Sequence, residues 1–151
     1  MYHLTRFLFP VQPHERWASW LLLLLRLLFG GLLLAHGIDK WIRFEELELH
    51  FPDPLAVGSR FSLMLCIFAE VFCAGFVILG LLTRLMLIPI VIALLVALFV
   101  IHHGQPFFSR ELPFIFLSLF LLLMLFGPGR YSFDAWIGRH TAPRLQDANA
   151  R

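Results

Sequence analysis

Two charged residues fall inside long apolar stretches of this chain. Arg26 interrupts the apolar run at 18–40, and Glu70 lies within a second run. Arginine keeps its charge at any accessible pH, and a charge at the bilayer centre costs at least ~2.5–3.5 kcal/mol on insertion scales. We therefore predict that Arg26 pairs with Glu70 inside a helical bundle, with His36 as the alternative partner of Glu70. Such a pair either fixes helix register or lines a polar binding site or a proton path.

A second set of polar residues is expected to meet at the outer rim of the bundle. This outer-rim cluster comprises His36, Lys40, His102, His103 and Glu111. Imidazole and carboxylate groups suit zinc, copper or iron, so a metal or haem site is one interpretation. A pocket for a polar headgroup is another. No histidine pair has ligand spacing within one helix, which favours a hydrogen-bonded cluster at the membrane–water boundary and assigns no metal ligand.

The two cysteines lie on either side of Glu70. Cys66 and Cys73 are seven residues apart, which separates them by ~10 Å along a straight helix. That distance is too long for a disulfide. Buried cysteine mostly behaves as a small hydrophobic residue, and a thiol-redox role here would need a partner protein.

Four membrane-spanning helices are needed to position these residues. A bilayer core requires about 20 apolar residues per helix, and the apolar runs predict helices at 18–40, 61–82, 85–101 and 111–126. Very short connections force neighbouring helices to run antiparallel. The predicted fold class is therefore all-α, a transmembrane four-helix bundle of up-down topology. Close helix contacts are expected at Gly30, Gly31, Gly75 and Gly80.

The composition supports an integral membrane protein. Of the 151 residues, 60% are hydrophobic and 15% charged, and the mean hydropathy is +0.82. We expect an interfacial segment at 1–17, the transmembrane domain at 18–135 and a cytoplasmic tail at 136–151. The connection at 41–59 is predicted to be a surface loop or a short amphipathic helix. Dispersed basic residues give no nucleic-acid patch, so the lipid bilayer is the expected partner.

The distribution of basic residues predicts the orientation. Four spans put both termini on one side, and that side holds more basic residues than the other. The positive-inside rule then places both termini in the cytoplasm. The first helix is longer than the ~7–15 residues of a signal-peptide core, so we interpret it as an uncleaved anchor.

An ordered set of residues between about 20 and 135 resembles the DoxX family. It includes His36-Gly37 with Lys40, the run LGLLTR at 79–84, the FPDP loop at 51–54, and GPG at 127–129 followed by Ser132 and Asp134. The resemblance implies a multi-pass protein of the bacterial inner membrane. Some relatives are membrane subunits of thiosulfate:quinone oxidoreductase, and others belong to oxidoreductase assemblies that handle oxidative stress.

Three functions follow as hypotheses. The first is a membrane subunit of a quinone-linked oxidoreductase system or oxidative-stress complex, with quinone as the favoured ligand and a soluble oxidoreductase as partner. The second is a non-enzymatic scaffold that docks soluble redox enzymes. The third is a small-molecule transporter, although four helices without inverted repeats make this unfavourable for a monomer. A homo-oligomer is compatible with all three, and the residues assign no catalytic group.

Overall fold

The described part of the chain is a bundle of helices. The computed structural model describes residues 16–54 and 56–140. Its helical elements are α2 (Arg16–Ile42), α3 (Phe44–Leu47), α4 (Ser59–Ile67), the π-helical η1 (Phe68–Cys73), α5 (Ala74–Leu79), α6 (Thr83–Val96), the π-helical η2 (Ala97–Ile101), α7 (Phe107–Phe126), and a last helix at 133–140. The described residues contain no strand.

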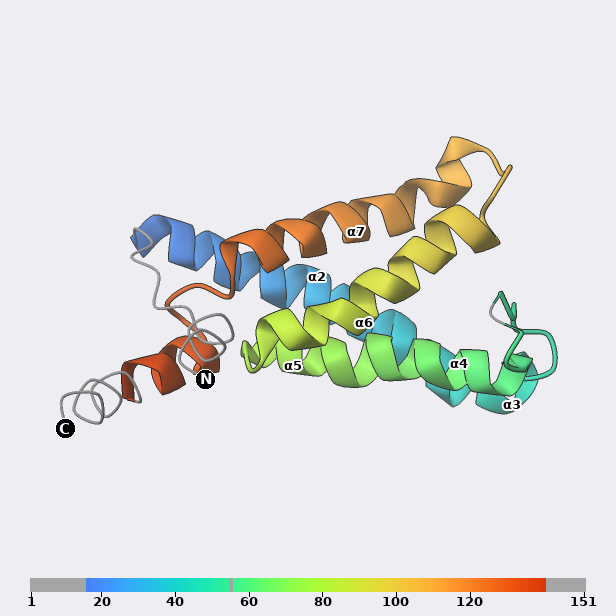
Figure 1. The fold of residues 1–151 in the computed structure, drawn as a ribbon, viewed down its shortest axis with the longest axis horizontal. Helices are drawn as coiled ribbons and strands as arrows, with labels where there is room; N and C mark the ends of the chain where they lie inside the picture. The colour runs from blue at the N-terminus through green and yellow to red at the C-terminus, as the bar shows by residue number, and fades with distance from the viewer. Residues whose placement is uncertain (1–15, 55, 141–151) are drawn as a thin grey trace, which may run out of the picture.

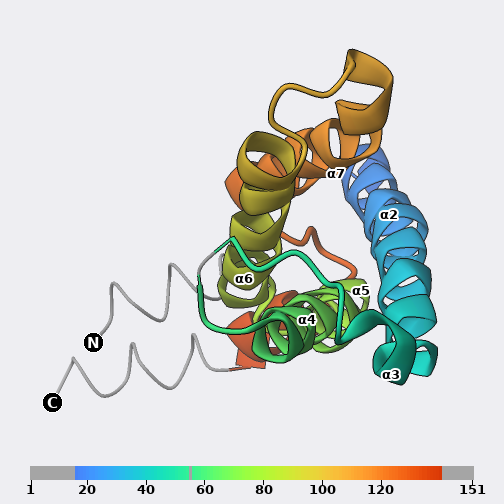
Figure 2. The same ribbon diagram turned by 90° about the vertical axis from the view of Figure 1, so that its right-hand side faces the viewer.

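Four helical spans are long and apolar enough to cross a membrane. They are α2, the continuous helix α4–η1–α5, the continuous helix α6–η2, and α7. Successive spans run antiparallel around a common core, as Figures 1 and 2 show. This confirms the predicted all-α, four-helix transmembrane fold.

The bundle has two distinct ends. We name the end that holds the start of α2, the α5–α6 corner and residues 133–140 the terminal end (Figure 1). The opposite end, with α3 and the α6–α7 connection, is the loop end. Both ends of the described chain therefore lie at the terminal end, as an even number of spans requires.

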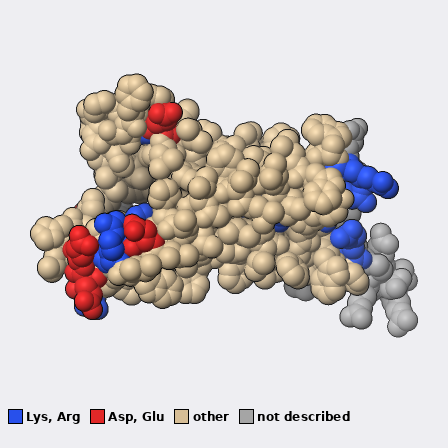
Figure 3. All heavy atoms as spheres, turned by 180° about the vertical axis from the view of Figure 1, so that it is seen from behind, with Lys and Arg blue, Asp and Glu red and all other residues tan. Residues whose placement is uncertain are grey.

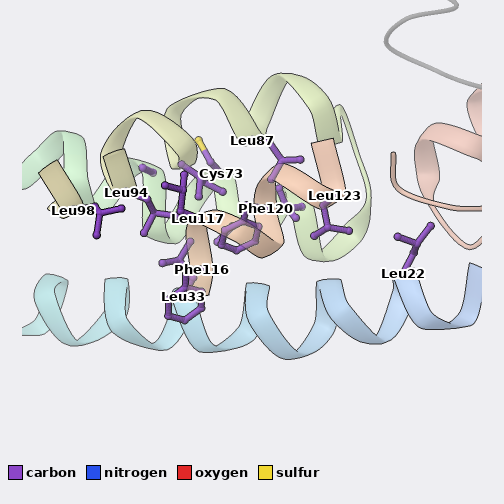
Figure 4. Packing of buried hydrophobic residues seen from close by; sticks show 14 residues of the cluster. Leu22, Leu33, Cys73, Leu87, Leu94, Leu98, Phe116, Leu117, Phe120 and Leu123 are labelled. Carbon is purple, nitrogen blue, oxygen red and sulfur yellow. The ribbon is translucent and has the colours of Figure 1, made fainter. Parts of the chain in front are cut away.

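The core is apolar, and so is much of the outer surface. Leu33, Leu87, Phe116 and Phe120 are among the buried residues that lie between α2 and the other spans (Figure 4). Large apolar side chains along every span are also exposed, such as Leu28, Phe72 and Ile92. On the face seen in Figure 3, this surface is a wide, largely uncharged band between two charged ends. A surface of this kind suits a lipid environment.

Two helix boundaries differ from the prediction by three residues or more, for local reasons. α7 begins at Phe107 rather than Glu111, directly after Pro106, whose ψ of 153° places it outside the helix. The second span ends at Leu79 rather than Leu82, because Gly80 adopts a left-handed conformation with φ of 72°. The amide of Leu81 then bonds to the carbonyl of Phe76, which closes the helix with a Schellman motif.

The 41–59 connection contains one helical turn, α3, followed by an anchored loop. The carboxylate of Asp53 accepts hydrogen bonds from the Val57 and Gly58 amides, at 3.1 and 2.7 Å, and from Ser62 Oγ at 2.7 Å. One aspartate therefore ties the FPDP loop to the start of α4. Most of the expected interfacial segment at 1–17 and of the tail at 136–151 lies outside the described residues.

Orientation can be tested with reporters. We expect alkaline phosphatase, which is active only outside the cytoplasm, to be inactive when fused after Arg151. The same enzyme inserted at Gly58 should be active, because an exposed turn at the loop end would face outward. Activity at Arg151 together with inactivity at Gly58 would reverse the predicted orientation.

Candidate functional site

Lys40 and Glu70 form an ion pair that joins the first two spans. Lys40 Nζ donates to both carboxylate oxygens of Glu70, at 2.5 Å to Oε1. The side chains are 26% and 13% exposed respectively, so the pair is shielded but not sealed. Cys66 Sγ donates to Glu70 Oε1 at 3.4 Å. An ammonium, a carboxylate and a thiol therefore meet in one place near the loop end.

A glycine and a π-helical segment position this pair. A Cβ built at Gly37 would lie 2.7 Å from Glu70 Cβ and 2.9 Å from the Glu70 carbonyl carbon, so only glycine permits this approach of α2 to η1. Lys40 follows Gly37 by three residues, which brings its side chain to the same face. Glu70 lies within η1, and π-helical segments inside α-helices are frequent at functional sites.

Of the glycines expected at close contacts, two behave as predicted. A Cβ at Gly30 would meet Ile78, and one at Gly80 would overlap the Arg26 guanidinium. Gly31 and Gly75 have nothing within 4 Å. The tightest approach to another span's backbone is at Gly37, which belongs to the His36-Gly37 pair of the DoxX-like pattern.

The predicted Arg26–Glu70 ion pair is wrong. Glu70 binds Lys40, and Arg26 Nη2 donates to the Tyr131 carbonyl. The prediction placed the start of the first span level with the end of the second span. Instead, Arg26 lies level with Gly80, at the end of the second span. Glu70 lies ten residues before Gly80, which is ~15 Å away along the helix axis. The alternative Glu70–His36 pair is not formed either.

Arg26 is enclosed at the terminal end. Its exposed fraction is 0%, and besides Nη2 its guanidinium nitrogens have no hydrogen-bond partner among the described residues. Gly80 leaves the space that the guanidinium fills. The carboxylate of Asp134 favours the positive charge electrostatically. Arg26 is therefore held by the segment that follows α7 rather than by another span.

Asp134 also organises the start of α6. Its carboxylate oxygens accept hydrogen bonds from the amides of Leu82 at 2.6 Å and Thr83 at 2.8 Å. Its own amide donates to the Gly80 carbonyl at 2.8 Å. A carboxylate at a helix N-terminus satisfies unpaired amides and complements the helix dipole. The two contacts hold Leu82 in a left-handed conformation with φ of 48°, unusual for leucine.

The structure does not gather the outer-rim cluster into one site. His36 packs edge-on against Phe116 with ring centroids 6.2 Å apart, and His102 Nδ1 lies 2.7 Å from the Ala97 carbonyl. His103 and Glu111 are exposed. Among residues 16–54 and 56–140, no hydrogen bond joins any two of the five, and no three His, Cys, Asp or Glu side chains are placed to hold a metal ion. Lys40 alone of the five reaches the Glu70 carboxylate.

Removing Asp134 should destabilise the fold strongly. Asp134→Ala leaves the Arg26 charge uncompensated and frees two amides at the start of α6, so we expect unfolding in detergent to be easier by roughly 3 kcal/mol. Asp53→Ala is the matched control, because that aspartate also accepts several hydrogen bonds but lies at the loop end, away from Arg26. Its expected cost is about 1 kcal/mol. Equal losses in the two variants would contradict the role assigned to Asp134.

The Lys40–Glu70 pair should show coupling in a double-mutant cycle. Glu70→Leu alone leaves a half-buried ammonium, and we expect a loss of roughly 2 kcal/mol in unfolding free energy, less than the ~3–5 of fully buried pairs. Adding Lys40→Met should recover much of that loss. Adding Arg26→Leu to Glu70→Leu should recover none. Recovery with Arg26→Leu instead would restore the pairing first predicted from the sequence.

A comparison with known proteins gives the chain a family. The family model for DoxX matches residues 21–103, more than half of the chain, and this region contains Arg26, Gly37, Lys40 and Glu70. No curated protein and no solved structure matches the chain. The match agrees with the resemblance seen in the residues and with the four apolar spans. The chain is a multi-pass membrane protein and belongs to the DoxX family.

Proposed function

We propose that this protein is the quinone-binding membrane subunit of an oxidoreductase assembly in the bacterial inner membrane. The observation that carries the proposal is the partly exposed Lys40–Glu70 pair within an apolar bundle. Ionisable residues inside membrane spans are rare, and by default they indicate a functional site. The quinone itself is suggested by the redox roles that the DoxX resemblance implies for relatives.

Access to the pair fits a lipid-soluble substrate. Trp41 follows Lys40, and Phe68 and Phe72 flank Glu70 in η1; all three aromatic side chains are about half exposed on the outer surface. Trp41 and Phe72 stack with ring centroids 6.1 Å apart, as do Phe68 and Phe72 at 6.0 Å. A quinone that diffuses in the bilayer would meet this aromatic surface before it reaches the charged pair.

The chemistry of the pair matches both redox forms of a quinone. The Lys40 ammonium has three donors, of which Glu70 uses two, so one remains for a quinone carbonyl oxygen. The Glu70 carboxylate can accept a hydrogen bond, and then a proton, from a quinol hydroxyl. Quinone reduction takes up two electrons and two protons. In this proposal a partner oxidoreductase at the loop end exchanges the electrons, and Glu70 exchanges protons.

The partner is expected at the loop end because the charged pair lies there. A notch separates the lobe at the α6–α7 connection from the rest of that end in Figure 3. His36 and Phe116 face each other from α2 and α7 in this half of the bundle. If both termini are cytoplasmic, the partner acts outside the cytoplasm.

Quinone binding gives a direct test. We expect purified protein in detergent to show a thermal shift with a short-chain ubiquinone, saturating with concentration. Glu70→Gln and Lys40→Met should each weaken binding by about tenfold, the loss of one hydrogen bond to a charged group. Glu111→Gln, an exposed acid at the same end, is the matched control and should bind like the wild type.

The result also separates the proposal from its main alternative. A scaffold would capture a soluble oxidoreductase yet show no saturable quinone shift, with the wild type and the two pair variants behaving alike. That outcome would reject a quinone site at Lys40–Glu70.

A further inference from the structure

A second feature capable of binding lies at the terminal end, far from the Lys40–Glu70 pair. Residues that follow α7 form an open cleft of about 370 Å³ against Leu79 at the end of α5. Its walls carry two cations, Arg130 and Arg139, and the aromatic side chains of Tyr131, Phe133 and Trp136. This combination of cations and apolar surface is unlike that of the quinone site proposed above.

In the described part of the chain, no ion pair neutralises the positive charge of the cleft. Arg130 and Arg139 are exposed and form no ion pair with any of residues 16–54 and 56–140. Arg139 Nε donates to the Ala135 carbonyl at 3.1 Å, which leaves its terminal nitrogens available. Asp134, the acid in this segment, is fully buried and already engaged by the start of α6. On the face seen in Figure 3, the described residues of the terminal end show basic side chains and no acidic ones, whereas those of the loop end show both.

Aromatic residues place the cleft at the level of lipid headgroups. Trp17, Trp20, Tyr131 and Trp136 are all between 42% and 66% exposed at the terminal end. The rings of Trp20 and Tyr131 lie 4.7 Å apart, so α2 and the segment after α7 contribute to one belt. Tryptophan and tyrosine concentrate at membrane–water interfaces. Tyr131 and Trp136 belong to both the belt and the cleft.

From these observations we propose that the cleft binds the headgroup of an anionic phospholipid. Arg130 and Arg139 would contact the phosphate, because guanidinium groups match phosphate oxygens in charge and geometry. Leu79 and Phe133, which are 54% and 52% exposed, would lie along the acyl chains. A zwitterionic lipid is disfavoured, because its own cation stands beside the phosphate.

Lipid bound in this cleft would stabilise the fold. The Tyr131 carbonyl accepts the hydrogen bond from Arg26, and the neighbouring Ser132 packs against Gly80. A lipid that holds Arg130, Tyr131 and Trp136 in place therefore stabilises the segment that encloses Arg26. Binding to the native state raises apparent stability by an amount that grows with the logarithm of the ratio of ligand concentration to Kd.

Thermal unfolding in detergent with added lipid tests the proposal. We expect phosphatidylglycerol to raise the unfolding temperature of the full chain, phosphatidylcholine to raise it much less, and inorganic phosphate to have no effect. Arg130→Gln with Arg139→Gln should lose the phosphatidylglycerol effect, with affinity falling roughly fivefold for each arginine removed. Arg60→Gln removes another exposed arginine, at the loop end, and should respond like the wild type.

A second measurement guards against a variant that folds poorly. Retained lipid can be counted by native mass spectrometry. Arg130→Lys with Arg139→Lys keeps the positive charge, so we expect this variant to retain much of the lipid. Equal retention of phosphatidylglycerol by the wild type and the glutamine variant would overturn the proposal. A rise in unfolding temperature produced by inorganic phosphate alone would assign the cleft to a free anion and overturn the lipid proposal.

Discussion

A guanidinium buried in an apolar bundle cannot lose its charge, so acceptors and negative charge must be brought to it. Here they come from the segment after α7, because the Tyr131 carbonyl lies 105 residues further along the chain than Arg26. Asp134 balances the charge and binds the first amides of α6 at the same time. One arginine thus joins α2, the α5–α6 corner and the residues that follow the last span.

The first span carries a second cation on the same buried stripe. Ser19, Leu22, Arg26, Gly30, Leu33 and Gly37 are the buried residues of α2, and Lys40 continues this spacing by three residues. The two cations are therefore ~21 Å apart along one helix. Arg26 is fully buried, whereas Lys40 and the Glu70 carboxylate that it binds are partly exposed. Because of this difference in exposure, we assign a structural role to Arg26 at the terminal end and a chemical role to the Lys40–Glu70 pair at the loop end.

Much of the fold could be predicted from local patterns. Four apolar runs interrupted by Pro, Gly and charged residues predicted four antiparallel spans, and the structure confirms them within a few residues. The errors at boundaries arise where one backbone conformation decides, as at Gly80 and Pro106. Part of the candidate site was also visible, since Glu70 and Lys40 are unusual in such surroundings. Their partnership was not, because pairing depends on the register between helices.

The sequence by itself therefore determined that the chain spans a membrane four times and that Arg26 and Glu70 need partners of opposite charge or good acceptors. These conclusions rest on the hydrophobicity of each segment and on the cost of burying a charge within it. Both depend only on the local composition of that segment. Only the tertiary structure decided which partners they have. The close approach of Gly37 to η1 sets the register that brings Lys40 to Glu70. Residues 129–136 fold back over the terminal end and supply the groups that hold Arg26. Tyr131 lies 105 residues after Arg26 in the chain, so no local sequence pattern predicts this contact.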